Sequence, residues 1–133
     1  MKHAEGITYF LLRVVSGVLM MTSGGLILFG WFGGIPGQPG RPPLLSQMGI
    51  GGVLEFVGGA LIALGLFTRP AAFVLSGMMA VAYWQFHAPA ALWPLQNQGV
   101  PAVLFCFIFL YMAAKGAGEW SLDALIRKRK PAA

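Results

Sequence analysis

Residues 70–114, PAAFVLSGMMAVAYWQFHAPAALWPLQNQGVPAVLFCFIFLYMAA, contain no Asp, Glu, Lys or Arg. A second stretch without these residues covers residues 14–40. In the whole chain 57% of residues are hydrophobic and 10% are charged, whereas soluble domains have roughly 25% charged residues. A chain of 133 residues with so few polar groups cannot cover a water-exposed surface. The sequence therefore predicts an integral membrane protein with a single domain, residues 1–133.

Apolar stretches occur four times along the chain, and about 20 residues suffice to cross a bilayer as a helix. We expect helices at about residues 7–32, 48–67, 70–87 and 100–114. The loops between them are rich in proline and glycine. After the fourth helix, Ser121 is suited to cap a short amphipathic helix at about residues 122–130. The predicted fold class is all-α, a transmembrane four-helix bundle followed by this short helix.

The N-terminal segment could also be interpreted as a secretory signal peptide. Glu5 and Arg13 interrupt its start, the apolar run at residues 14–32 exceeds a typical signal core, and no A-x-A-like site follows. We therefore expect the segment to remain as the first helix of the protein.

The positive charges predict the orientation in the membrane. With a cytoplasmic N-terminus, the inner side would carry Lys2, Arg13, Arg69, Lys115 and the basic run RKRK at residues 127–130, and the outer side only Arg41. Because cytoplasmic loops of membrane proteins are enriched in Lys and Arg, we expect both termini in the cytoplasm. A basic run beside a membrane helix is typical of contact with anionic lipid, so no nucleic acid partner is expected.

Glu55 is the residue with the strongest functional signal, because an ionisable side chain within a bilayer is costly. Together with Gly51 and Gly59 it forms a row spaced by four residues, on a face suited to close helix packing. It could serve a ligand or a proton, or it could be a structural carboxylate. By depth, His87 is its expected partner. The glycine faces could meet inside one bundle or between protomers, and we favour the interior.

Aromatic residues surround His87 in the sequence, including Tyr83, Trp84 and Trp93. They could form an aromatic belt at the membrane surface. They could equally form a pocket, open to the outer leaflet, for a planar lipid-soluble ligand such as a quinone. The chain has only two histidines and one cysteine, so we expect no metal site, no covalently bound cofactor and no self-sufficient enzyme.

Three charged residues, Arg13, Arg69 and Asp123, are expected to have structural roles. Arg13 should lie near the inner surface, with Asp123 or Glu119 as its partner, and Arg69 should be a cation in the turn between the second and third helices.

Several of these residues occur in an order that resembles a known family. The motifs are Arg13-x-x-x-Gly17, Glu55-x-x-Gly58-Gly59, LGLFTR at residues 64–69, His87 at the end of the third helix, Asn97-x-Gly99, and Gly116-x-Gly118-x-x-Ser121-Leu122-Asp123. Across nearly the whole chain, this pattern is similar to the DoxX family of small bacterial four-helix membrane proteins.

The resemblance implies a subunit in the bacterial cytoplasmic (inner) membrane that supports redox or oxidative-stress chemistry and is linked to quinone. From the residues themselves we expect a polar pocket near Glu55 and His87, with Trp84, Tyr83 and Asn97 close by. If the protein is enzymatic, it would be an oxidoreductase subunit. Family members usually carry a glutamate where this chain has Val100, so one intramembrane carboxylate is missing.

Two other functions remain open. The first is a non-catalytic scaffold or anchor that stabilises partner proteins, or self-associates, through its glycine faces and basic tail. The second is a small transporter, although no pair of broken helices marks a substrate site.

Overall fold

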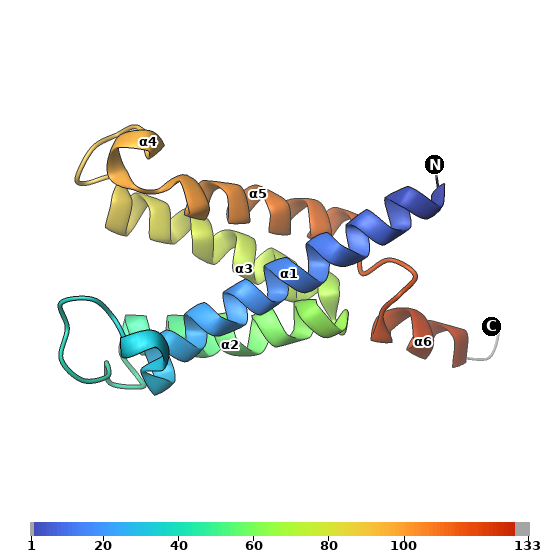
Figure 1. The fold of residues 1–133 in the computed structure, drawn as a ribbon, viewed down its shortest axis with the longest axis horizontal. Helices are drawn as coiled ribbons and strands as arrows, with labels where there is room; N and C mark the ends of the chain where they lie inside the picture. Colours follow the sequence, from blue (N-terminus) through green and yellow to red (C-terminus); the bar gives the residue numbers. More distant parts are fainter. Residues whose placement is uncertain (1, 130–133) are drawn as a thin grey trace.

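The computed structural model describes residues 2–129, which are mostly helical and contain no β-strand. The long helices are α1 (Lys2–Phe29), α2 (Gln47–Leu64), α3 (Thr68–Ala82) and α5 (Val100–Lys115). The short elements are the 3₁₀ turn η1 (Trp31–Gly33), the π-helical segment η2 (Tyr83–His87), α4 (Pro94–Asn97) and α6 (Leu122–Arg129). Figure 1 shows the four long helices side by side, with α6 beyond them at the end where the chain begins.

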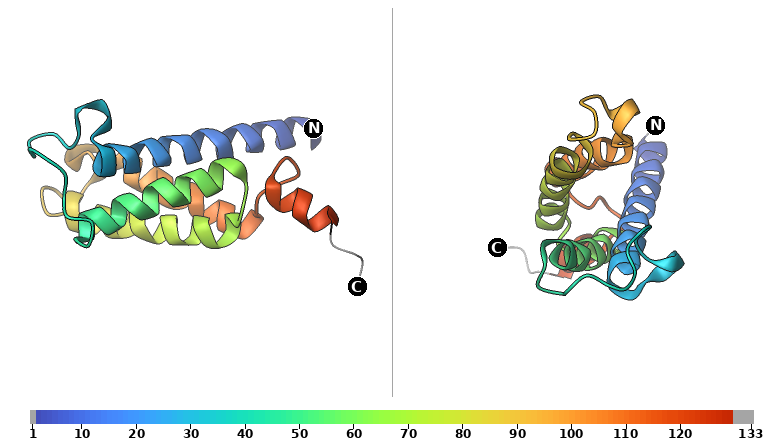
Figure 2. Two further views of the ribbon diagram at one scale, coloured as in Figure 1. Left: turned by 90° about the horizontal axis from the view of Figure 1, so that it is seen from below. Right: turned by 90° about the vertical axis from the view of Figure 1, so that its left-hand side faces the viewer.

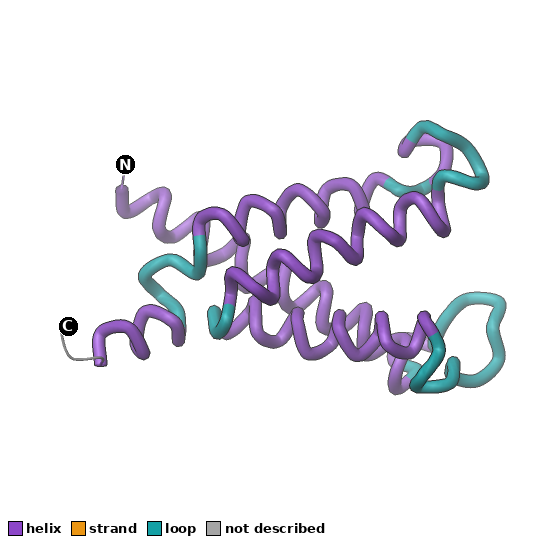
Figure 3. The backbone as a smooth tube through the Cα atoms, turned by 180° about the vertical axis from the view of Figure 1, so that it is seen from behind, coloured by secondary structure: helices purple, strands orange, loops and turns teal. Residues whose placement is uncertain are grey.

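The four long helices form two antiparallel pairs, α1 with α2 and α3 with α5, and the contact between α2 and α3 joins the pairs. In the left view of Figure 2 the long helices run roughly along one axis, and in the right view they are seen nearly end-on. In Figure 3 the pairs are close at the end that carries the termini and diverge toward the opposite end.

Glycines bring α1 and α2 into direct backbone contact. Gly17 and Gly24 of α1 face Gly59 and Gly52 of α2, and the spacing is seven residues in each helix. A Cβ atom at Gly17 would lie 2.6 Å from the carbonyl oxygen of Gly59, and one at Gly24 would lie 2.6 Å from that of Gly52. The glycine faces therefore meet inside the chain, where small residues allow close packing of membrane helices.

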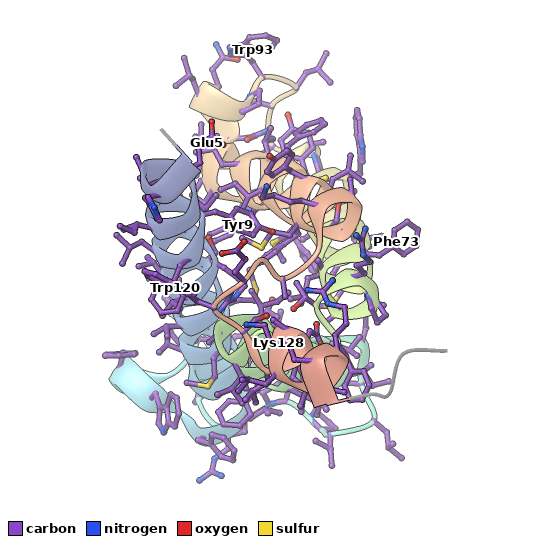
Figure 4. All side chains as sticks on the ribbon, turned by 90° about the vertical axis from the view of Figure 1, so that its right-hand side faces the viewer. Glu5, Tyr9, Phe73, Trp93, Trp120 and Lys128 are labelled. Atoms are coloured by element: carbon purple, nitrogen blue, oxygen red, sulfur yellow. The ribbon has the colours of Figure 1, made fainter. Side chains whose placement is uncertain are left out.

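The surface of the helices is rich in large apolar side chains. Phe73, which is 66% exposed, points away from α3 in Figure 4, and Leu19 and Phe107 are similarly exposed. By length and composition, the helical spans His3–Phe29 and Gln47–Leu64 can each cross a membrane, and α5 is a shorter apolar helix. Lipid is the solvent in which such a surface is stable.

Several helix boundaries differ from the expected ranges, and the second helix, for example, ends at Leu64 and not at about residue 67. The first helix begins at Lys2 and stops at Phe29, because Gly30 adopts a left-handed conformation with φ 74°. The third helix changes from α to π geometry at Tyr83, and the following loop contains the short helix α4. The last helix is described to Arg129; Lys130, which was included in the expected range, lies outside the described residues.

Candidate functional site

A cavity of about 370 Å³ opens between α2 and α3 in the divergent half of the molecule. Its walls include Gly51 and Glu55 of α2, Gly77 and Met78 of α3, Phe86 of η2 and Ile27 of α1. Most of these side chains are apolar, and the volume falls within the range of about 300–1,000 Å³ that small-molecule sites occupy. We call this space the Glu55 cavity.

Glu55 is held by a residue of the neighbouring helix. The hydroxyl of Ser23 in α1 donates a hydrogen bond of 2.8 Å to Oε2 of Glu55. The glycine register between α1 and α2 creates this pair, because it places Ser23 opposite Glu55. The hydrogen-bond partner of Glu55 is therefore Ser23, and not His87, which was expected from its depth in the membrane.

A pair of amides links α2 to η2 beside the cavity. Gln47 and Gln85 exchange two hydrogen bonds, of 2.6 and 3.0 Å between their amide groups. Gln47 also lines the Glu55 cavity, as does Phe86, the residue after Gln85. π-Helical turns are often found at functional sites, and here the π segment supplies one wall residue and one bridging amide.

His87 belongs to a separate cluster that folds the loop at residues 88–99. Its Nδ1 donates to the backbone carbonyl of Asn97 at 3.1 Å. The Asn97 side chain donates to the Tyr83 hydroxyl at 3.2 Å and to the carbonyl of Ala91 at 2.7 Å, and it accepts from the Gly99 amide at 2.8 Å. This cluster holds the loop in place through polar contacts within the chain.

Among the residues predicted for the pocket, only Glu55 borders the cavity in the part of the chain that the structure describes. His87, Tyr83, Asn97 and Trp84 are absent from its walls. Trp84 and Trp93 are each 64% exposed, and Figure 4 shows Trp93 at the far side of the molecule in that view. The π segment explains the difference, since Phe86 and not its neighbours lines the cavity.

Arg13 lies at the opposite end, near the termini, and is only 1% exposed. Its guanidinium donates to the carbonyl of Ile62 at 3.0 Å, of Ala117 at 2.7 Å and of Trp120 at 2.9 Å. Carbonyls at a helix C-terminus lack partners within the helix and attract cations. Arg13 therefore ties the end of α2 to the segment at residues 116–121.

Asp123 and Arg69 also bind helix ends. The Asp123 carboxylate accepts from the amides of Phe67 and Thr68, at 2.9 and 3.0 Å, where α3 begins. Arg69 donates to carbonyls at the end of α5, including that of Ala114. The hydrogen-bond partners of Asp123 are thus the amides of α3, and those of Arg13 are backbone carbonyls. All three charged residues stabilise the ends of helices.

Sequence reasoning did not identify three of the polar residues that shape these regions, namely Ser23, Gln47 and Gln85. Ser23 could have been found as the hydroxyl opposite Glu55, once the seven-residue glycine spacing was used to align α1 with α2. Among residues 2–129, no group of three or more His, Cys, Asp or Glu side chains is arranged to hold a metal ion.

Comparison with known proteins gives a family and two relatives. Residues 8–88 match the model of the DoxX family. An uncharacterised protein from Haemophilus influenzae is 44% identical over 90 residues, which cover 65% of this chain and 64% of that protein. The match thus spans less than two thirds of that relative's length. The inner membrane protein YqjF of Escherichia coli is 28% identical over 142 residues, covering 97% of this chain and 99% of that protein. No solved structure matches the chain.

Proposed function

Because this chain belongs to the DoxX family, we propose that it is an inner-membrane protein whose four long helices cross the bilayer, with both termini in the cytoplasm. The name of the Escherichia coli relative supports the location. The two ends of the described chain lie on the same side of the molecule, as an even number of crossings requires. Arg69, Lys115 and Arg127 border one cavity beside α6, and Arg13 binds the carbonyl of Ala117, which borders the same cavity. The loop before α2, which contains Arg41, lies at the opposite end of the molecule. This distribution agrees with a positive cytoplasmic face.

Within the membrane, the protein acts as a subunit that binds a planar, lipid-soluble ligand of the quinone class and so supports redox or oxidative-stress chemistry. The observation that carries this proposal is the Glu55 cavity, an apolar space that contains one carboxyl group and one amide, from Glu55 and Gln47. These groups fit a quinone, whose ring suits an apolar wall and whose oxygens need hydrogen-bond partners. When bound, a quinone would supply the electron-accepting chemistry that no side chain of the protein offers.

The residues of the chain would bind and orient such a ligand. Ser23 binds Oε2 of Glu55, which leaves Oε1 available to a ligand. Phe86 and Met78 provide apolar walls that exclude water. Electrons would come from a partner protein, so any enzymatic role would be that of an oxidoreductase subunit.

Quinone binding can be tested with two glycine variants that add the same side chain. Gly77 lines the cavity and Gly6 does not, and a Cβ atom at either position would meet no atom within 4 Å. Gly77→Leu should therefore fill the cavity without a backbone clash and lower quinone affinity by about tenfold or more, whereas Gly6→Leu should leave it unchanged.

The readouts are quinone extracted from the protein purified in mild detergent and the affinity for added quinone. The carbonyl oxygens of a quinone accept hydrogen bonds, so the Glu55 carboxyl group would donate to one of them in its protonated form. Glu55→Leu keeps a similar side-chain volume, removes this donor and should weaken binding. A purified protein without quinone, combined with equal affinities for Gly77→Leu and Gly6→Leu, would contradict the proposal.

A scaffold that anchors partner proteins is the second candidate function, and α6 favours it. This helix exposes Leu125 and Ile126 beside Arg127 and Lys128, so its surface offers both apolar and basic contacts. The glycine faces of α1 and α2 are occupied by each other and are not free for a partner. Truncation after Ile126 removes the basic tail and keeps the Asp123 contact with α3; loss of a co-purifying partner on this truncation, but not in Gly77→Leu, would favour the scaffold.

A further inference from the structure

A second cavity, of about 440 Å³, lies at the end of the molecule that carries the termini. Its walls come from the start of α3, the end of α5, the segment that follows α5, and α6, and they include Thr68, Arg69, Lys115, Gly116, Asp123 and Arg127. We call it the Arg127 cavity. We infer that this cavity binds a phosphate-bearing anion, independently of any ligand in the Glu55 cavity.

Three cations from three different elements border the cavity. Arg69 uses its Nη atoms to bind carbonyls of α5. Within residues 2–129 its Nε donates no hydrogen bond, so we assign this donor to the ligand. Lys115 has its Nζ 5.1 Å from the centre of the Tyr9 ring, and Arg127 is exposed on α6. Guanidinium and ammonium groups supplied by three elements match the several oxygens of a phosphate.

Two acidic residues, Asp123 and Glu119, also line the cavity. The Asp123 carboxylate is already bound by the two backbone amides at the start of α3, so its charge is compensated there. Glu119 is exposed, as are the three cations, so solvent screens all four of these charges. With three cations against these two acids, the lining retains a positive balance that favours an anion.

Local backbone geometry keeps space for the cations. Gly116 has φ 89°, and a Cβ atom there would lie 3.2 Å from Nε of Arg69. Thr68, another wall residue, has a buried Oγ1 that finds no hydrogen-bond partner within residues 2–129. Glycine at position 116 thus leaves Nε of Arg69 unobstructed beside the cavity.

The phosphate could belong to the headgroup of an anionic phospholipid or to a soluble phosphate. Both share the chemistry that the cavity recognises, and the lipid source would place the headgroup at the level of the exposed apolar residues of α6, Leu125 and Ile126. The two sources are separated by experiment.

The test compares Arg127→Gln with Lys128→Gln in the full-length protein in detergent. Both residues are exposed cations of α6, but only Arg127 lines the cavity. Native mass spectrometry measures binding of phosphatidylglycerol against phosphatidylcholine, and thermal shift measures binding of inorganic phosphate against chloride at equal ionic strength. Arg127→Gln should weaken binding of the anion by about fivefold, and Lys128→Gln by less than about twofold.

Each arm has a decisive result. Selective loss of phosphatidylglycerol binding in Arg127→Gln would identify the lipid headgroup as the source, and selective loss of the phosphate-induced shift would identify a soluble ligand. Equal losses in the two variants would show general surface electrostatics and overturn the inference. So would the absence of both a preference for phosphatidylglycerol and a stabilisation by phosphate in the unaltered protein.

Discussion

At the scale of single residues, charged side chains near the termini stabilise the ends of helices, and Arg13 does so most extensively. It is almost fully buried, and its guanidinium serves carbonyls of α2 and of the segment after α5. A charged group in such surroundings is tolerated because each of its three nitrogen atoms donates to a backbone carbonyl. The motif Arg13-x-x-x-Gly17 therefore combines a buried cation with the first glycine contact of α1.

Replacing Arg13 tests this role. Arg13→Met keeps an unbranched side chain but leaves the carbonyls of Ala117 and Trp120 without their donor. We expect a loss of about 3 kcal/mol in unfolding free energy, measured by unfolding in mixed micelles. Arg41→Met, which changes an exposed cation in the loop before α2, should alter the stability by less than about 0.5 kcal/mol. Similar losses in the two variants would contradict the role of Arg13.

The sequence identified Glu55 correctly as an unusual carboxylate within an apolar helix, but not its partner. Depth along the helices suggested His87, whereas the hydrogen bond comes from Ser23. The pairing depends on the rotation and register of α1 against α2, which composition and depth do not determine. Likewise, Arg13 was expected to pair with Asp123 or Glu119 near the inner surface. In the structure Arg13 binds a carbonyl at the end of α2, and Asp123 binds amides at the start of α3.

At the scale of elements, the α1–α2 contact depends on glycine in a way that the α2–α3 contact does not. Seven-residue spacing places two glycines of each helix on the shared face. Gly58 of α2, by comparison, faces the flexible side chain of Leu75, which a Cβ atom would approach to 3.1 Å. The first contact is between backbones and cannot adjust, whereas the second can repack.

Alanine should have opposite effects at two helical glycines, one that contacts the backbone of a neighbouring helix and one that faces open space. Gly59→Ala would place Cβ 2.6 Å from the carbonyl oxygen of Gly17, so we expect a loss of about 2 kcal/mol or more. Gly77→Ala meets no atom within 4 Å and should leave the stability unchanged or raise it by up to about 1 kcal/mol, because alanine favours helix formation. Thermal denaturation in detergent measures both, and a stable Gly59→Ala protein would disprove the backbone contact.

The approximate positions of the long helices could be predicted from sequence, but the geometry of their ends could not. The apolar runs and the proline- and glycine-rich loops indicated the approximate positions of α1, α2, α3 and α5. The π geometry of η2 had no sequence signal, because it depends on how residues 83–87 pack beside the loop they precede. That shift in geometry decides that Phe86 lines the cavity, so the walls of the site could not be predicted.

At the scale of the whole molecule, the all-helical class and the DoxX family were predicted from the sequence and are confirmed. The orientation in the membrane stays a prediction. Its physical basis is the unequal distribution of cations between the two ends of the molecule.

Cysteine labelling tests the orientation. In a Cys106→Ala background, which removes the chain's one native thiol, Arg41→Cys and Lys128→Cys place a new thiol at opposite ends of the molecule. A membrane-impermeant maleimide should label position 41 in spheroplasts and position 128 only after the membrane is permeabilised. Labelling of both positions in intact spheroplasts would contradict an even number of crossings with cytoplasmic termini.

The central claim is that the space beside Glu55 receives a lipid-soluble ligand, and photoaffinity labelling tests it most directly. The protein in lipid nanodiscs is irradiated with a photoreactive quinone, and the modified peptides are mapped by mass spectrometry. Labels should concentrate at residues 47–55 and 77–86, where α2, α3 and η2 line the cavity, and excess unmodified quinone should displace them. Labels spread evenly over lipid-facing side chains such as Phe73 and Phe107, without displacement, would contradict it.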